Sequence, residues 1–321
     1  MLMHAASEFD PASRRDWTLR YASFVQHAWN EDKRVFRNFM RFDRTWCEDE
    51  GSEDSNGRAL WALGVTAARA PDPQVRKWGW RWYDTALMTC CDSGSPRALA
   101  FTMLGASAAL AARPDHGATR ECLEHGVKVL THLLAASRRP DWAWFEAVLA
   151  YDNPRLPQAL IEAGRAVNDD AAVAAGLESL RWIAAQQTAA SGHFRPIGSE
   201  SFGRAHDSLP FDQQPLEAQA AIEAAASAYA VDGDRFWIEH AHAAWRWFFG
   251  ANDRGAVLGD LSTGICRDGI GPRGANENCG AESVLAFHLS YYSMIAFSRA
   301  EGRNGAGESV GSEVAEPVRA Y

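Results

Sequence analysis

Residues 141–160 read DWAWFEAVLAYDNPRLPQAL and join an acidic, aromatic loop to an alanine- and leucine-rich helical pattern. Two tryptophans, a phenylalanine and a glutamate stand together at residues 142–146. A Tyr-Asp-Asn-Pro turn at residues 151–154 then leads directly into the helix. Aromatic rings beside carboxylates suit the binding of a flat, hydroxylated molecule such as a sugar. Because other parts of the chain repeat this order of loop and helix, the stretch indicates the architecture as well as the type of ligand.

Helical periodicity dominates the rest of the chain. Apolar residues recur at spacings of three and four, whereas alternating runs of β-branched residues are almost absent. Proline marks several boundaries, because Pro96 stands where a helix begins and Pro71 and Pro73 follow a helix end. The pattern predicts helices over residues 17–39, 57–70, 74–89, 96–112, 119–137, 145–167, 169–187, 215–231, 235–249 and 281–300.

The predicted helices are of two kinds that alternate along the chain. One kind follows a long loop and is rich in Ala, Gly and Leu, as in RALWALG, RALAFTMLGASAALAA, LPQALIEAG, PLEAQAAIEAAASAYA and AESVLAFHLSYYSMIAF. Small residues allow close packing and suit an inner ring, whereas the amphipathic kind suits an outer ring. The alternation predicts an all-α fold, an (α/α)6 toroid of six helical hairpins, with an open α-solenoid as the alternative. Residues 1–300 are expected to form this single domain, and residues 301–321 a disordered tail.

This arrangement has a consequence for the site. If each long loop leads into an inner helix, all the long loops lie at one end of the barrel. Their side chains then converge on its mouth, where the N-termini of the inner helices also point. We therefore expect the functional residues in the long loops.

Composition narrows the range of partners. The net charge of −9 over 321 residues argues against nucleic acid, because binding to phosphates requires a basic surface. The first residues contain no apolar leader, and the uncharged apolar run at residues 98–112 is too short to span a membrane. The six cysteines show no CxxC pair and no metal-finger spacing. Reduced thiols in the cytoplasm are therefore expected, with Cys90 and Cys91 as buried thiols.

The first three long loops place acidic and aromatic side chains before inner helices. The first crowds six carboxylates around one tryptophan, although a solvated acidic loop with a serine helix cap is the plainer alternative. In the short second loop, Asp92 or Arg97 is able to reach a site. The tryptophans of the third loop serve equally well as packing residues when each is taken alone. Candidates from the first and third loops are Trp46, Glu53, Asp54, Arg58, Trp142, Trp144, Glu146, Asp152 and Asn153.

The last two long loops repeat the arrangement. Asp212, Gln213 and Gln214 precede the helix that begins at Pro215, and a carboxylate with two amides offers both donors and acceptors to neighbouring hydroxyls. A capping role for Asp212 is the alternative. The glycines of the fifth loop form no phosphate-binding or dinucleotide fingerprint, so we expect no cofactor and no metal. Candidates from this loop and the helix after it are Asp268, Asn276, Asn278 and Glu282.

The segments EDSNGRALWALG, DWAWFEAVLAYDNPRLPQAL, FDQQPLEA and NENCGAES resemble the six-hairpin glycosidase-like superfamily of (α/α)6 barrels. They also resemble a bacterial family often found beside or fused to glycosyltransferases. The resemblance extends over most of residues 42–300 and implies a glycoside hydrolase that acts on an oligosaccharide or polysaccharide. Such an enzyme uses two carboxyl groups, one as general acid and the other as base or nucleophile. Glu146 and Asp212 are the first pair to test, with Asp54 and Glu282 as substitutes, and Trp142 and Trp144 are expected to stack on sugar faces.

Three alternatives remain open. Sugar epimerases and isomerases on the same barrel use histidines as acid and base, for which His193, His206 and His288 are available without forming a recognisable pair. A prenyltransferase-like toroid requires a zinc site of Asp, Cys and His, and the sequence shows no suitable cluster. The domain is also suited to bind a glycan without turnover, as the partner of a glycosyltransferase.

Overall fold

The computed structural model describes residues 1–6, 8–201 and 210–304, and its contacts group into two compact units, Met1–Ala185 and Gln186–Tyr321. Eleven α-helices and four two-residue strands occur in the described ranges. No helix in these ranges is long and apolar enough to cross a membrane. His206 and residues 305–321 of the predicted tail lie outside the described residues. That residues 1–300 form a single domain stays a prediction.

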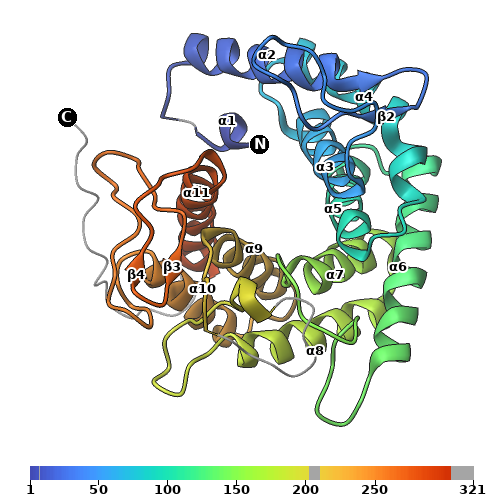
Figure 1. The fold of residues 1–321 in the computed structure, drawn as a ribbon. Coiled ribbons are helices and arrows are strands. Elements are labelled where there is room, and N and C mark those ends of the chain that lie inside the picture. The colour runs from blue at the N-terminus through green and yellow to red at the C-terminus, as the bar shows by residue number, and fades with distance from the viewer. Residues whose placement is uncertain (7, 202–209, 305–321) are drawn as a thin grey trace. The chain divides into compact units, whose positions relative to one another are not determined.

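The first unit consists of eight helices and one hairpin, as Figure 1 shows. The antiparallel strands β1 and β2 follow α2 directly. The bounds are α1 Leu2–Ala5, α2 Pro11–Ala28, β1 Trp29–Asn30, β2 Val35–Phe36, α3 Glu53–Arg69, α4 Pro73–Cys91, α5 Pro96–Ala112, α6 Gly117–Ser137, α7 Arg155–Val167 and α8 Asp170–Gln186.

The second unit contains a short 3-10 helix, three α-helices and a small hairpin. Helix α9 packs against both α10 and α11 (Figure 1). Pro215 begins α9, Gly233 ends it in the left-handed conformation with φ +68°, and Asp234 caps α10. The bounds are η1 Ser199–Ser201, α9 Pro215–Asp232, α10 Arg235–Trp247, β3 Ile270–Gly271, β4 Gly274–Ala275 and α11 Ala281–Asn304.

Several predicted helix boundaries are wrong, two of them by ten residues or more. The helix predicted over residues 17–39 ends at Ala28, because the buried Asn30 starts a hairpin there. Its side chain donates to the carbonyl of Asp49 over 2.9 Å and accepts from the backbone of Asp32 over 3.1 Å. The helix predicted from residue 145 begins only at Arg155. An irregular loop precedes it, in which Asp152 has a left-handed φ of +51°.

Small residues let the alanine-rich helices pack closely. Helix α5 is buried continuously over residues 97–110, between α3 and α7, which lie beside it in Figure 1. A Cβ added at Gly64 of α3 would lie 2.6 Å from the carbonyl carbon of Gly105 in α5. By contrast, α6 buries only one stripe, which includes Leu123, Val127, Leu130 and Leu134.

The expectation for the cysteines is half right. Cys90 is a buried thiol, as predicted, and burial raises its pKa to about 12. Cys91, however, forms a disulfide with Cys122 that joins α4 to α6, with the Cα atoms 5.6 Å apart. The sequence could not reveal this pair, because the two residues are 31 positions apart and meet only when the helices pack.

Replacing Gly64 with Ala should destabilise the protein, because the new methyl group meets the backbone of α5 rather than a movable side chain. We expect a loss of about 1–3 kcal/mol in the free energy of unfolding, measured by urea denaturation. Gly117→Ala is the matched control, since a Cβ at Gly117 meets no atom within 4 Å. Equal stability of the two variants would contradict the close contact between α3 and α5.

His240 should make the protein less stable in mild acid. It is buried in α10 beside the rings of Phe194 and Phe236, and burial lowers its pKa from 6.5 to about 4. Between those two values the unfolded chain binds the proton more readily, so stability is complete above pH 6.5 and falls as the pH drops towards 4.

The loss between pH 7 and pH 5 should be about 2 kcal/mol, seen as a lower midpoint in urea at the lower pH. His240→Gln should flatten this dependence, whereas His132→Gln on the exposed face of α6 should leave it unchanged. An unaltered pH dependence in the His240 variant would show that another group causes it.

Candidate functional site

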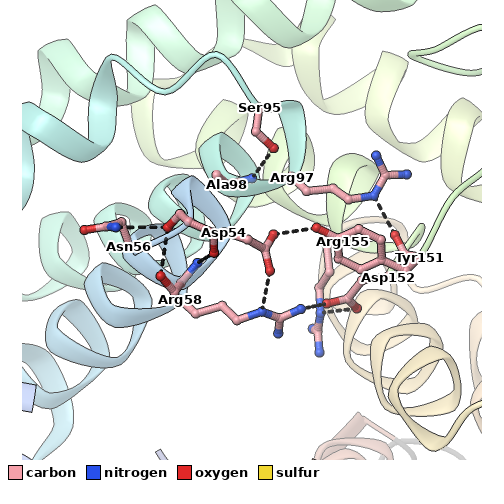
Figure 2. Close-up of polar contacts among 11 residues, drawn as sticks. Asp54, Asn56, Arg58, Ser95, Arg97, Ala98, Tyr151, Asp152 and Arg155 are labelled. Atoms are coloured by element: carbon pink, nitrogen blue, oxygen red, sulfur yellow. Dashed lines mark hydrogen bonds and ion pairs between the residues drawn. The ribbon is translucent and has the colours of Figure 1, made fainter. Parts of the chain in front are cut away.

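The site of the first unit is built from the first turns of α3, α5 and α7 and the loop before α7. Figure 2 shows how their polar side chains meet. Ser52 caps α3 by accepting from the backbone of Ser55 over 3.1 Å, and Ser95 caps α5 by accepting from Ala98 over 3.4 Å. These caps fix the N-terminal ends of α3 and α5, where Arg97 lies in the first turn of α5 and Arg58 in the second turn of α3. Because α5 packs against both α3 and α7, these first turns contribute to one polar network.

A buried carboxylate lies at the centre of this network. Asp152 is completely buried and accepts from the guanidinium of Arg58 over 2.9 Å and from Nε of Arg155 over 3.3 Å. Arg155 is itself buried, and its guanidinium lies over the ring of Trp61. Burial alone would lower the pKa of Arg58, but the charges of Asp152 and Asp54 outweigh it and raise the pKa. Two arginines thus compensate the charge of Asp152.

Tyr151 extends the network to Asp54. Its hydroxyl donates to Oδ1 of Asp54 over 2.8 Å, while Oδ2 of Asp54 accepts from Nε of Arg58 over 3.1 Å. Burial, together with this hydrogen bond and the charge of Asp54, raises the pKa of Tyr151. The phenol therefore stays protonated at neutral pH and orients one oxygen of the Asp54 carboxylate.

Arg97 connects the same tyrosine to Glu146. Its Nε donates to the carbonyl of Tyr151 over 2.6 Å, and its guanidinium donates to Glu146 over 2.7 Å and to Asn153 over 3.2 Å. The carboxylates of Asp54 and Glu146 keep 26% and 24% of their side-chain surface exposed, whereas Asp152 keeps none. Asp54 and Glu146 are therefore two partly solvent-accessible carboxylates of one hydrogen-bonded network.

Five of the candidates predicted from the sequence meet in this network: Asp54, Arg58, Glu146, Asp152 and Asn153. Tyr151 was missed, although it lies within the stretch at residues 141–160, and Arg155 was counted among the polar residues of the third loop without a role of its own. Arg97 was considered only as a side chain able to reach a site. The signal for all three was their position beside the turn or in the first turn of an inner helix.

The remaining candidates of the first unit lie elsewhere. Trp144 is completely buried and stacks on Trp182 with ring centroids 5.9 Å apart, which is the position of a packing residue. Trp142 is also buried, edge-on to Trp182. Trp46 packs against Phe24. Glu53 is exposed and accepts from the backbone of Gly94 over 2.9 Å, in the turn before α5.

In the second unit, a buried hydrogen-bond network holds Gln213. Its amide donates to Asp253 over 2.5 Å and accepts from Trp247 over 2.9 Å. Asp253 also accepts from Arg195 and His193, and these hydrogen bonds lower its pKa although burial opposes them. Gln213 therefore orders the loop that precedes α9.

The other candidates of the second unit are more dispersed. Asp212 is half-buried, and its carbonyl accepts from the backbone of Ser199. Asp268 accepts from the side chain of Asn278 and from the backbone of Gly280, which orders the loop before α11. Gln214 directly precedes α9, and the backbone N–H of Asn276 donates to the carbonyl of Gly269. Glu282 is exposed in the first turn of α11. The ring of His288 contacts the carbonyl of Gly264.

Within residues 1–6, 8–201 and 210–304, no group of three or more His, Cys, Asp or Glu side chains could hold a metal ion. The described polar networks instead join carboxylates to arginine, tyrosine and amide groups. Such a site can hold hydroxyl groups through donors and acceptors, and it presents carboxylates for proton transfer.

No family model and no curated protein matches the chain. Solved structures do match over most of its length. Cellobiose 2-epimerase from Spirochaeta thermophila is 14% identical, with 94% of this chain and 86% of that chain covered and a TM-score of 0.65. A D-mannose isomerase is 10% identical, with 93% and 84% covered and a TM-score of 0.67. The family 76 mannosidase Bt3792 from Bacteroides thetaiotaomicron is 11% identical, with 90% and 99% covered and a TM-score of 0.54.

These similarities define the fold class. The matching structures are six-hairpin (α/α)6 proteins, and this chain has the same all-α fold. The predicted fold class is confirmed. At identities of 9–14%, the likeness extends to the fold and not to individual site residues.

Asp152→Asn should destabilise the protein strongly. The substitution keeps the shape of the side chain and tolerates the left-handed φ, but it removes the buried negative charge that Arg58 and Arg155 contact. We expect a loss of about 3 kcal/mol or more in urea denaturation. Glu178→Gln, which breaks the exposed ion pair with Arg138, is the control and should cost at most about 1 kcal/mol. Equal losses in the two variants would show that the buried carboxylate of Asp152 contributes no more to stability than the exposed carboxylate of Glu178.

Proposed function

We propose that the protein is a carbohydrate-active enzyme that hydrolyses a glycosidic bond in an oligosaccharide or polysaccharide, with Asp54 and Glu146 as its carboxylate pair. One observation carries this proposal: both carboxylates are partly exposed and are held on the same arginine and tyrosine network. The fold, shared with solved glycoside hydrolases, supports it.

In such a reaction one carboxyl group protonates the departing glycosidic oxygen, and the other activates water or attacks the sugar directly. Both roles require carboxyl groups that are fixed relative to the bond that breaks. Arg97 fixes Glu146, whereas Arg58 and Tyr151 fix Asp54, so the network supplies this rigidity without covering either carboxylate completely. The other two predicted catalytic carboxylates, Asp212 and Glu282, belong to the second unit, and their catalytic role stays a prediction.

A sugar epimerase or isomerase is the second candidate. The observation in its favour is that structures described as a cellobiose 2-epimerase and a D-mannose isomerase match the chain with TM-scores of 0.65 and 0.67. Against it, the described candidate histidines are engaged in local contacts, His193 with Asp253 and His288 with the carbonyl of Gly264. We therefore place hydrolysis first.

Two further expectations stay proposals. A role beside a glycosyltransferase accords with a carbohydrate ligand. A cytoplasmic location accords with the thiol of Cys90, whereas the Cys91–Cys122 disulfide is typical of an oxidising compartment.

The test is product release from a panel of manno-, gluco- and galacto-linked oligosaccharides, with interconversion of intact sugars followed in the same samples. On the cleaved substrate, Glu146→Gln and Asp54→Asn should each lower kcat by about 10²- to 10⁴-fold, because each removes one proton-transfer group. Glu124→Gln on the exposed face of α6 is the control and should retain full activity.

The possible outcomes separate the candidates. Cleavage that survives both substitutions would refute Asp54 and Glu146 as the pair. Interconversion without cleavage would establish the epimerase or isomerase. If neither reaction occurs while a sugar still raises the melting temperature, the protein is a glycan-binding partner and the proposed hydrolysis is wrong.

A further inference from the structure

A cavity of about 240 Å³ lies in the first unit between α1, α2 and the turn that joins α3 to α4. Helix α2 contributes positions 11, 14, 15 and 18, which share one face because residues three and four apart lie on the same side of a helix. None of the lining residues belongs to the network around Asp152. The volume is somewhat below the range of about 300–1,000 Å³ for drug-sized ligands, so the cavity suits a compact molecule.

Half of the ten residues that line this cavity are apolar. They come from all three parts of its wall, and they are Met3, Pro11, Ala70, Pro71 and Val75. A smaller cavity of about 90 Å³ shares three of the lining residues and is itself lined mainly by apolar side chains. The cavity therefore favours a ligand with an apolar part.

The charged residues of the wall leave one positive charge without an ionic partner. Nε of Arg15 lies 3.0 Å from Oδ2 of Asp72, so the charges of these two residues compensate each other. Arg14 is the third charged residue of the wall, and no carboxylate in the described ranges forms an ion pair or a hydrogen bond with its guanidinium. One uncompensated charge favours a ligand with a single negative charge.

The guanidinium of Arg14 has accessible donors. Its Nε is buried without a hydrogen-bond partner, whereas its terminal nitrogens are accessible and make no hydrogen bond to the described residues. Asp10 acts on Arg14 only through its charge, since its exposed carboxylate caps α2 by accepting from Ala12 and Ser13 over 3.0 Å. Asp10 does not line the cavity, and solvent screens its charge. The terminal nitrogens of Arg14 are thus able to donate to a carboxylate.

His4 is the neutral polar group of the wall. Its Nε2 lies 3.1 Å from the hydroxyl oxygen of Thr66. Burial, the charge of the terminal amine and the charge of Arg14 together lower the pKa of His4 to about 4. The imidazole is therefore uncharged at pH 7, and Arg14 supplies the charge of the cavity.

We propose that this cavity binds a compact monocarboxylate with a short aliphatic chain. The carboxylate accepts two parallel hydrogen bonds from the terminal nitrogens of Arg14, and the chain packs against Met3, Pro11 and Val75. An inorganic dianion would meet only one uncompensated positive charge, with the carboxylate of Asp72 in the same wall. The inference goes beyond the proposed function, because no residue of the cavity contacts Asp54 or Glu146.

The test is isothermal titration of the intact protein at pH 7 with hexanoate, hexanamide, acetate and inorganic phosphate. Hexanamide keeps the chain without the charge, and acetate keeps the charge without the chain. Hexanoate should bind about tenfold or more tightly than hexanamide, because hydrogen bonds between charged groups are the stronger ones. It should also bind more tightly than acetate, which buries less apolar surface.

Arg14→Gln should weaken the binding of hexanoate by about tenfold or more, since the amide lacks the charge and the fork of donors. Arg14→Lys restores the charge but not the fork, so it should recover only part of the affinity. Arg20→Gln is the matched control, because it makes the same substitution at an exposed position of α2 that lines neither cavity. It should leave the binding of hexanoate unchanged.

Four results would overturn the proposal: no binding of hexanoate, equal binding of hexanamide, equal binding of phosphate, or equal weakening in the Arg14 and Arg20 variants. The comparison of the ligands tests the site without any substitution. Glu146→Gln, which removes a carboxylate of the proposed catalytic pair, should bind hexanoate as tightly as the unaltered protein. The fate of the proposed hydrolysis and the fate of this site are therefore decided by separate measurements.

Discussion

The buried carboxylate of Asp152 is the constraint on which the first unit depends. A carboxylate without solvent is tolerated only if cations and hydrogen bonds replace the water that it has lost. Arg58 of α3 and Arg155 of α7 provide this compensation, and Asp152 itself belongs to the loop that connects them in space. Helices α3 and α7 and the loop before α7 are therefore held together by these ion pairs. The partly exposed carboxylates of Asp54 and Glu146 are then positioned from this locked centre.

Close packing of backbones makes the network geometrically feasible. Gly64 and Gly105 allow α3 and α5 to approach without intervening side chains, and Gly57 does the same against Ala98 nearer the first turns. With larger residues at these positions, the helices would separate and the arginine side chains would no longer span the distance to their partners. The glycine and alanine content of the inner helices thus serves the polar site as well as the core.

The loop before α7 divides its residues between two tasks. Trp142 and Trp144 are buried and pack against Trp182 of α8. Glu146 faces Arg97 in the carboxylate network. A few consecutive residues thereby combine packing against α8 with the placement of one partly exposed carboxylate.

Local sequence signals determined the helices but not the network. Pro96 and the apolar run after it predicted α5 with its observed bounds, because helix starts and periodicity depend on near neighbours. The end of α2 was mispredicted, since Asn30 reaches Asp49, and the disulfide of Cys91 was missed because Cys122 is 31 residues away. Burial likewise separated Trp144 as a packing residue from the exposed carboxylates. Only the tertiary structure decided these points, because Arg58 and Asp152 are 94 residues apart and their pairing depends on how the helices pack, which no short segment specifies.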